Sequence, residues 1–451
     1  MPLSKSHVND VKQFSNGNHV HFGEGELVMA TQEKGPGEPG GPQTRLEAQI
    51  GLVQRGIPGV HEGLDGAGSA PDDWAEKNDV NYLFRHRTLL VRDTDVDRLQ
   101  PVVPGAPVAH ENNVRGLTRF ELSDPELTVD DACSAADEAL GEGVVSPDHI
   151  FYIVTTSTCA ATEPDPIPPH ALPEPAVSTG PCDGEGTLIA ILDSGLLPGA
   201  ASEHTWLAGA EGEDDEWSGG DPPRILPYAG HGTFMAGVAR TMAPKAGIWG
   251  PRTFRVAGAK YESELVKDVT DALGRGAEVI TLAFGTNTRK DVPPLGFEVV
   301  GERLAHYSGV VLVAAAGNAS SRRPFWPAAY HWAVSAGALS ANSRSRASFS
   351  NYGSWVDVYA PGDGLINAYA TGTYKYTEPP RAGQEADFQG MCRWSGTSFS
   401  APLVSGLIAA RMSQTGENGR QAAAALLARA QAQALPGVGP VLLPGQAWDD
   451  R

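Results

Sequence analysis

Apolar runs alternate with amphipathic segments along the C-terminal half of the chain. Three short runs have the length and composition of buried strands: Thr187–Leu192, Ala277–Gly285 and Val310–Ala315. Longer segments with a helical period separate them: Gly232–Met242, Glu262–Arg275 and Leu295–Ser308. Because buried strands that alternate with helices are typical of a parallel sheet covered on both faces, we predict an α/β fold for this half.

A smaller pattern of the same kind precedes this half. Strand-like and helix-like segments follow one another in the order β-α-β-α-β, over Thr88–Arg92, Asp93–Leu99, Gly116–Leu122, Thr128–Leu140 and Ile150–Val154. The longer helix is expected to begin at a capping Thr128, with acidic residues in its first turn, and to end before Gly141. We therefore predict a small α+β domain over residues 82–157.

Segments rich in proline and glycine mark the remaining boundaries. Residues 1–81 contain a breaker cluster at 35–42 and only short apolar runs, which predicts a loop-rich extension with fragmentary strands or disorder. Residues 158–185 favour extended polyproline geometry with few buried contacts, which predicts a linker before a larger domain over 186–451. Within that domain Thr371–Met391 is a polar insertion whose pattern indicates no function.

Composition excludes several classes of partner. The chain has 451 residues, with 34 Lys and Arg against 54 Asp and Glu, and its net charge of −20 argues against nucleic acids and anionic membranes as partners. It has no run of about 18 apolar residues, and its first residues lack the apolar core of a signal peptide, so we expect a cytoplasmic protein. The four cysteines, in no metal-ligand spacing, are expected to be free thiols: Cys133, Cys159, Cys182 and Cys392.

Four short motifs carry residues suited to acyl transfer. Ser398 stands in Gly-Thr-Ser-Phe-Ser-Ala-Pro (396–402), where a tight turn at Gly396 is expected to lead into a helix with Pro402 in its first turn. Asp193 follows a predicted strand, His231 stands in Gly-His-Gly-Thr, and Asn318 ends Ala-Ala-Gly-Asn. A serine nucleophile needs a base, a carboxylate that orients the base, and donors for the oxyanion.

These motifs, in the order Asp, His, Asn, Ser, resemble those of the subtilases, the subtilisin-like serine peptidases, over about residues 186–410. The order Asp, His, Ser is the one known for subtilisin itself, so this is a match to a known pattern. The resemblance implies a subtilisin-like parallel sheet flanked by helices. It also implies the roles of nucleophile for Ser398, general base and then acid for His231, orienting carboxylate for Asp193, and oxyanion donor for Asn318.

The resemblance also implies where a protein or peptide substrate binds. The substrate backbone would pair with the edge of the strand that ends at Gly285, and the substrate side chain before the cut would enter a pocket. The predicted substrate-binding residues at this edge and pocket are Ala283, Phe284, Gly285, Ala315, Ala316, Gly317 and Phe325. A bulky Phe325 near the pocket floor favours Ala, Gly or Ser at that substrate position. The small α+β domain resembles the family's propeptide in arrangement only, and an unrelated accessory domain is the alternative.

Two places depart from the family pattern. Phe234 stands where many subtilases have the second His of His-Gly-Thr-His, and we expect no effect on the chemistry. Asp214, Asp215 and Glu216, within the acidic run Glu211–Glu216, could bind calcium, as in several subtilases, but we favour a solvated acidic loop, because calcium sites need oxygens that converge from a defined turn. We expect no other cofactor and no metal site.

The sequence therefore predicts an intracellular serine endopeptidase. An active protease in the cytoplasm needs restraint, which favours inhibition by its own N-terminal region and a dedicated protein substrate. The alternative is a catalytically silent subtilase fold that acts as a binding module.

Overall fold

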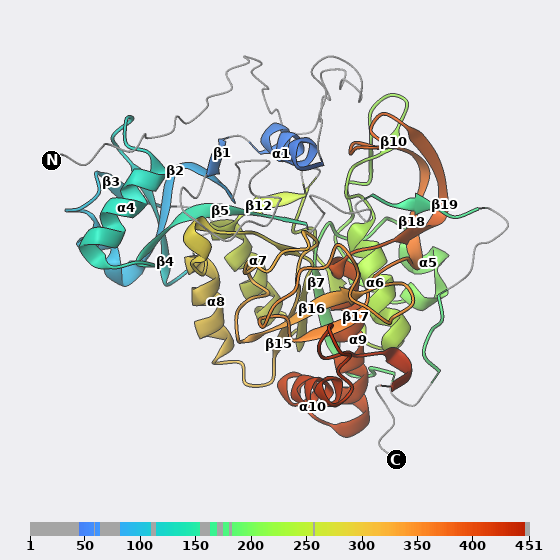
Figure 1. Cartoon of the computed structure of the whole chain (residues 1–451). Helices are drawn as coiled ribbons and strands as arrows, with labels where there is room; N and C mark the ends of the chain where they lie inside the picture. The colour runs from blue at the N-terminus through green and yellow to red at the C-terminus, as the bar shows by residue number, and fades with distance from the viewer. Residues whose placement is uncertain are drawn as a thin grey trace. The chain divides into compact units, whose positions relative to one another are not determined.

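The computed structural model describes residues 45–57, 59–63, 82–109, 114–153, 163–168, 175–179, 183–255 and 258–446. All elements named below lie within these residues, and Figure 1 shows their order along the chain. In this part of the chain, no helix combines the length and the apolar character needed to cross a membrane.

A parallel sheet forms the centre of the larger domain. Among the described residues seven strands pair in the order β17, β16, β15, β13, β7, β11 and β8, and each of these pairings is parallel. Their bounds are β7 Leu188–Leu192, β8 Glu211–Gly212, β11 Gly247–Gly250, β13 Val279–Leu282, β15 Val311–Ala315, β16 Ala333–Leu339 and β17 Val358–Pro361. The predicted run Ala277–Gly285 divides into β13 and the short β14 (Phe284–Gly285), which pairs in another sheet.

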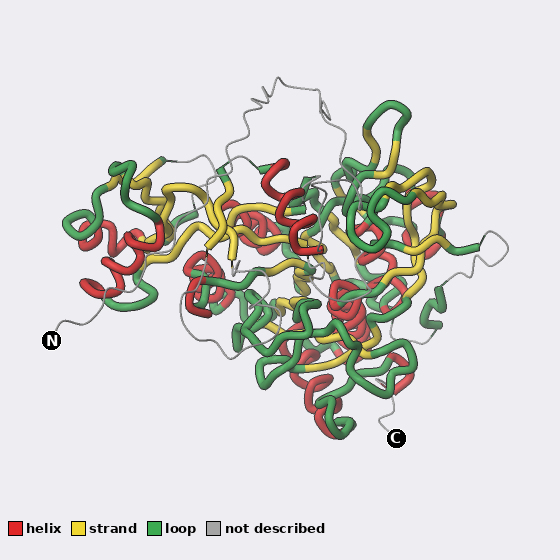
Figure 2. Tube along the Cα trace, turned by 45° about the horizontal axis from the view of Figure 1, so that its top comes forward, coloured by secondary structure: helices red, strands yellow, loops and turns green. Residues whose placement is uncertain are grey.

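Helices cover both faces of this sheet, and Figure 2 distinguishes them from the strands. Along β7, Ile189 and Ile191 belong to the core formed with α6 and α9, whereas Ala190 and Leu192 belong to the core formed with α7 and α8. This alternation is what a strand buried on both faces requires. The bounds of the helices are α5 Ala200–Glu203, α6 His231–Met242, α7 Glu262–Gly274, α8 Leu295–Leu304, α9 Thr397–Thr415 and α10 Gly419–Ala432.

The smaller domain is an antiparallel sheet with the helix α4 packed on it. Its strands pair in the order β5, β2, β4 and β3, and β12 of the larger domain pairs with β5. The helix α4 contacts β2 and β5 through Ala132, Cys133 and Ala136. The bounds are β2 Tyr82–Arg92, α3 Val96–Leu99, β3 Gly105–Val108, β4 Leu117–Leu122, α4 Val129–Leu140, β5 Val145–Ile153 and β12 Ala259–Tyr261. The side chain of Thr128 accepts from the N–H of Asp131, as the predicted cap requires.

The range predicted to be loop-rich contains regular structure. Residues 45–63 include the helix α1 (Arg45–Gly56) and the strand β1 (Val60–Gly63), which pairs with β2. Val53 of α1 packs against Leu83 and Ile150 of the small domain. A helix was not predicted for this range, because α1 has few apolar residues. These are buried only by contact with a sheet that is formed by later residues of the chain.

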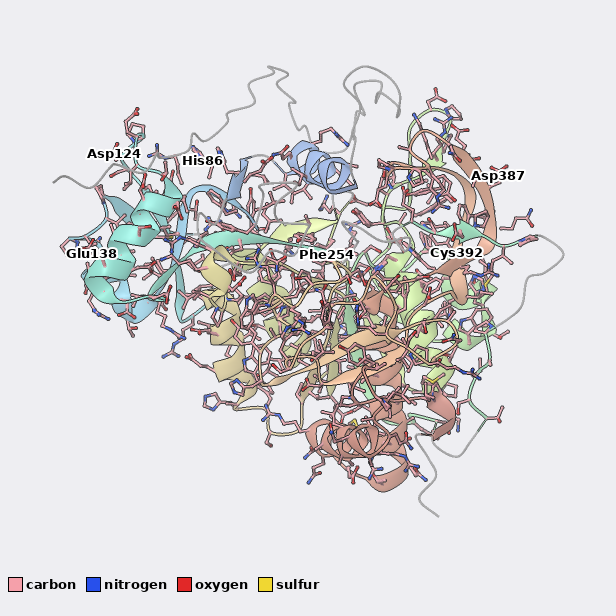
Figure 3. All side chains as sticks on the ribbon, in the orientation of Figure 1. His86, Asp124, Glu138, Phe254, Asp387 and Cys392 are labelled. Atoms are coloured by element: carbon pink, nitrogen blue, oxygen red, sulfur yellow. The ribbon has the colours of Figure 1, made fainter. Side chains whose placement is uncertain are left out.

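The predicted insertion forms a long hairpin, and part of the predicted linker is docked on it. The strands β18 (Leu365–Lys375) and β19 (Glu385–Trp394) pair antiparallel, and β6 (Asp165–Pro166) pairs with β19. Figure 3 labels Asp387 and Cys392 on β19. The short strands β9 (Ser218–Gly219) and β10 (Arg224–Ile225) complete this sheet.

A buried carboxylate fixes the linker segment to the hairpin. Glu163 is 6% exposed, and its side chain accepts from Tyr374 Oη at 2.9 Å and from the N–H groups of Thr377 and Glu378 at 2.8 and 3.3 Å. Burial raises the pKa of this carboxyl. The expectation of few buried contacts is therefore wrong for residues 163–168. This segment has few apolar residues, but the Glu163 side chain and the pairing of β6 with β19 fix it to the hairpin.

Candidate active site

The carboxyl ends of three adjacent strands of the parallel sheet carry the predicted site residues. Asp193 follows β7, Ala283 follows β13, and Ala316, Gly317 and Asn318 follow β15. Because parallel strands end at one edge of the sheet, open α/β sheets place their sites there. The fold therefore brings together residues that lie far apart in the sequence.

His231 and Asp193 form a buried pair. His231 is the first residue of α6, and its Nδ1 lies 2.8 Å from Asp193 Oδ1. The two residues are 2% and 0% exposed. The N–H of Ser194 donates to the same Oδ1 at 2.8 Å, which fixes the carboxylate. A carboxylate bonded to Nδ1 leaves Nε2 as the ring nitrogen available to act as a base.

Ser398 is the second residue of α9 and is 1% exposed. The ring of its neighbour Phe399 lies 5.4 Å from that of His231, and the ring of Trp394 lies 5.2 Å from it. Phe234 packs 4.4 Å from Phe399 between centroids. Aromatic packing therefore places the helix end that carries the serine beside the imidazole.

Two local expectations about this helix end are wrong. Gly396 has φ 164°, an extended conformation open to any residue, so the turn does not require glycine. Pro402 is inside α9 and beyond its first turn. It has no N–H to donate to the carbonyl four residues earlier, which is that of Ser398.

Asn318 is held by the residue that precedes the serine. Its Oδ1 accepts from the N–H of Thr397 at 2.8 Å and from Thr397 Oγ1 at 3.0 Å, and the residue is 2% exposed. With Oδ1 directed to Thr397, the Nδ2 donor faces Gly396, where a β-carbon would lie 3.6 Å from it. The preceding Gly317 has φ +96°, and a β-carbon there would overlap Asn351 Nδ2, so this position requires glycine.

The strand β5 of the small domain lies between two edges of the larger domain. Tyr152 pairs with Gly285 of β14 on one side and with Ala259 of β12 on the other, and both pairings are antiparallel. We call the space between β12 and β14 the cleft. Phe151 is fully buried there, with its ring 4.8 Å from Phe297. The predicted substrate edge therefore pairs with a strand of the same chain.

Phe325 lies between the predicted pocket walls. A β-carbon on Gly285 would overlap Phe325 Cε1, and one on Gly317 would lie 3.1 Å from Phe325 Cδ1. The loop is fixed, because the N–H and carbonyl groups of Thr286 and Trp326 exchange two hydrogen bonds of 2.9 Å. The remaining predicted residues, Ala283, Phe284, Ala315 and Ala316, are fully buried.

A further residue, Asp215, lies next to the His231–Asp193 pair and was not predicted from the sequence. Asp215 is only 6% exposed, and its Oδ2 accepts from Ser194 Oγ at 2.8 Å and from the N–H of Gly230 at 2.7 Å. A solvated loop therefore does not describe this part of the acidic run. Within the described ranges, no group of three or more His, Cys, Asp or Glu side chains is arranged to hold a metal ion.

Comparison with known proteins assigns the chain to a family. The model of the Subtilase family matches residues 184–439. Thermitase of Thermoactinomyces vulgaris is 32% identical over 243 residues, which cover 51% of this chain and 77% of thermitase. Halolysin of Haloferax mediterranei is 26% identical over 383 residues, which cover 80% of this chain and 66% of halolysin.

A solved structure supports the fold. The crystal structure of fervidolysin from Fervidobacterium pennivorans, described as a keratinolytic enzyme related to subtilisin, matches with a TM-score of 0.55 and 18% identity. The match covers 82% of this chain and 61% of fervidolysin. The predicted subtilisin-like fold is confirmed, and this chain belongs to the subtilase family, whose members are the subtilisin-like serine proteases.

Proposed function

We propose that this chain is a serine endopeptidase that hydrolyses protein substrates through an acyl-enzyme. The observation that carries the proposal is the buried His231–Asp193 pair, 2.8 Å apart, beside the helix end that holds Ser398. A base oriented by a carboxylate and placed next to a serine is the arrangement that acyl transfer requires. Membership of the subtilase family supports the same reaction.

Each group has one role in the proposed reaction. His231 takes the proton of Ser398 Oγ as that oxygen attacks the scissile carbonyl, and then gives it to the leaving amine. Asp193 stays ionised and stabilises the imidazolium. The Asn318 amide and the N–H of Ser398 donate to the oxyanion. Water, deprotonated by His231, then releases the acyl group and restores the serine.

An active-site titration tests this function directly. After self-cleavage and dilution of the chain, a phosphonylating serine reagent is expected to label the wild-type protein once, at Ser398, and to abolish hydrolysis of a casein substrate. Mass spectrometry of the labelled peptide locates the modification, and the Ser398→Ala chain is the control that takes no label. A wild-type chain that folds but neither labels nor hydrolyses casein would instead support the alternative, a silent binding module.

The pocket supports a preference for small residues. Because the Phe325 ring occupies the space between Gly285 and Gly317, a large side chain has no room there. We expect Ala, Gly or Ser at the substrate position before the cut. A missing or added methylene in such a pocket changes kcat/KM by about 10- to 200-fold, so larger side chains are selected against strongly.

Replacing Phe325 with glycine should open this pocket. The expected result is a rise of about 10- to 200-fold in kcat/KM for Phe relative to Ala before the cut, measured with a peptide library and mass spectrometry. Tyr307→Ala is the matched control, since Tyr307 is an exposed aromatic residue, 43% accessible, outside the pocket. A wild-type profile dominated by Phe, Leu or Arg would contradict the assignment of Phe325 to the pocket.

We also propose that the small domain inhibits the enzyme of which it is part. Its strand β5 occupies the edge, between β12 and β14, at which a substrate strand would bind. Backbone pairing of this kind is one way in which peptides are recognised at the edge of a sheet. While β5 occupies the cleft, no other polypeptide can pair there.

Charged contacts supplement this pairing. Arg289, in the loop after β14, donates to Asp130 at 2.6 Å, Asp137 at 2.8 Å and Ser134 at 2.8 Å, all on α4. The side chains of Arg289 and Asp137 are 8% and 12% exposed, so solvent screens their contact little, whereas Asp130 is 57% exposed. Asp148 of β5, fully buried, accepts from the N–H of Ser263 in the first turn of α7.

Two segments of the chain flank the bond that we propose is cut. Residues up to Ile153 pair in the cleft, and from Glu163 the chain is docked on the hairpin. The residues between them, 154–162, lie outside the described residues. Because both neighbouring segments are fixed on the same domain, this part of the predicted linker is where we expect self-cleavage.

A cytoplasmic location and a dedicated protein substrate complete the proposal. Two buried free thiols, Cys133 and Cys392, support a reducing compartment.

A further inference from the structure

The acidic run Glu211–Glu216 lies next to the segment that follows Asp193, on the side of the His231–Asp193 pair. It begins in the edge strand β8, after which the N–H of Leu196 donates to the carbonyl of Glu213 at 2.9 Å. The N–H of Asp215 in turn donates to the carbonyl of Leu196 at 2.8 Å. Gly195 has φ +90°, and a β-carbon there would lie 2.6 Å from the carbonyl oxygen of Glu213. Four residues of the run, 211–214, are exposed, and this backbone contact turns the next one, Asp215, inward.

The Asp215 carboxylate controls the backbone on both sides of His231. Its Oδ2 accepts directly from the N–H of Gly230, at 2.7 Å. It also accepts from Ser194 Oγ, at 2.8 Å, and that hydroxyl oxygen accepts from the N–H of Gly232 at 3.1 Å. The N–H groups before and after His231 are therefore both held from one carboxylate.

The same carboxylate also acts on Asp193. Because the Ser194 hydroxyl donates to Asp215, the serine is fixed in the orientation in which its own N–H donates to Asp193 Oδ1 at 2.8 Å. That oxygen is the one bonded to His231 Nδ1. Asp215 is therefore linked to Asp193 through Ser194, and to His231 through the neighbouring residue Gly230.

We propose that Asp215 is a positioning residue for the reaction: it fixes the loop ends that carry His231 and Asp193, and its charge stabilises the imidazolium. It touches no reacting atom. The inference rests on the proposed serine endopeptidase activity, because it assigns a residue to that reaction. Nothing in the sequence pattern singles out Asp215 from its acidic neighbours.

Three titratable groups surround Asp215, namely Asp193, His231 and the hydroxyl of Tyr369. The pKa of Asp215 is raised to about 7, chiefly by burial and also by the charge of Asp193, although the two donated hydrogen bonds and His231 lower it. Above that pH the folded protein holds a buried carboxylate that the unfolded chain ionises near pH 4. By linkage, this group lowers stability as the pH rises from about 4 to about 7, so its charge is retained at a cost.

Variants of the full chain separate a positioning role from a structural one. Asp215→Ala removes the acceptor, and we expect kcat to fall about 10- to 100-fold with KM changed less than about twofold. Asp215→Asn keeps an acceptor oxygen but no charge, so part of kcat should return. The acidic limb of the kcat/KM profile should then move to lower pH, because loss of a nearby negative charge destabilises the imidazolium. Asp214→Asn, at the exposed neighbour, is the matched control.

A second readout needs no activity. In the Ser398→Ala background, the low-field proton NMR signal of His231 Nδ1–H should change in chemical shift when Asp215 is replaced by asparagine, because the Asp193–His231 hydrogen bond loses its support from Asp215. The thermal unfolding midpoint of Asp215→Asn should not fall above pH 7, since the substitution removes a buried charge. Unchanged kcat, pH profile and NMR chemical shift would overturn the inference, as would a loss of activity explained fully by a lower unfolding midpoint. Absence of phosphonate labelling in the wild type would instead count against the proposed function.

Discussion

Replacing Asn318 with alanine is expected to lower kcat by about a hundred- to a thousandfold, or about 2.7–4 kcal/mol, with little change in KM. This range was measured on subtilisin itself. We apply it here because the Asn318 side chain is held in a fixed orientation, as a donor to an oxyanion must be. Thr397 holds Oδ1 through two hydrogen bonds, so the amide cannot turn its donor away. The effect belongs to the transition state, because the substrate carbonyl carries little charge before attack.

Asn318→Asp is the companion variant. It keeps an oxygen for Thr397 but replaces the Nδ2 donor, so kcat should be at least as low as in Asn318→Ala. Steady-state kinetics on one peptide series measure both variants, and circular dichroism checks that they fold. Normal kcat in either variant would remove Asn318 from the site.

Self-cleavage of the full chain is the second large effect that we expect. The wild-type chain should be cut within residues 154–162, mapped by mass spectrometry, whereas the Ser398→Ala chain stays whole. Arg289→Ala should then raise peptidase activity by about 10- to 100-fold at equal concentration. The reason is that it removes the hydrogen bonds of Arg289 to α4, and the loss of even one bond to a charged group, about 1.5–3 kcal/mol, corresponds to a change of about 10- to 100-fold.

A surface ion pair elsewhere provides the control for this experiment. Lys267→Ala removes a pair with Asp271 on the exposed side of α7, at side-chain exposures of 42% and 50%, and should leave activity unchanged. Suppose instead that the chain hydrolyses peptides while staying whole, and that Arg289→Ala is no more active than the wild type. The small domain would then serve folding or partner recognition.

The elements that carry the motifs could be predicted because their signals are local. The strand predicted over Thr187–Leu192 is β7, and the helix predicted after His231 is α6. Buried strands and their flanking helices show their period in a short window of sequence. The docking of β6 on β19 could not be predicted, because Asp165 pairs with Arg393, more than two hundred residues later, and no local pattern records such a contact.

The candidate site divides in the same way. The four motif residues were identifiable by type and order, and the structure places His231 and Asp193 in contact and Asn318 beside the residue that precedes Ser398. Asp215 was not identifiable, because its role depends on a loop crossing behind Ser194 and its neighbours in sequence are solvated. Arg289 was missed for the same reason, since its partners lie on α4 of another domain.

The position of β5 has a consequence for how the enzyme would respond to its own concentration. Under the proposed inhibition, β5 is tethered while the chain is whole, and its effective concentration at the cleft would be in the millimolar range, however dilute the protein is. A cut between Ile153 and Glu163 would make the small domain a separate molecule, because the chain from Glu163 onward stays bound to the hairpin. Inhibition would then depend on the protein concentration: a concentrated sample would stay inactive and a dilute one would become active. Because the cut is not reversed, the change from tethered to free inhibitor would be permanent.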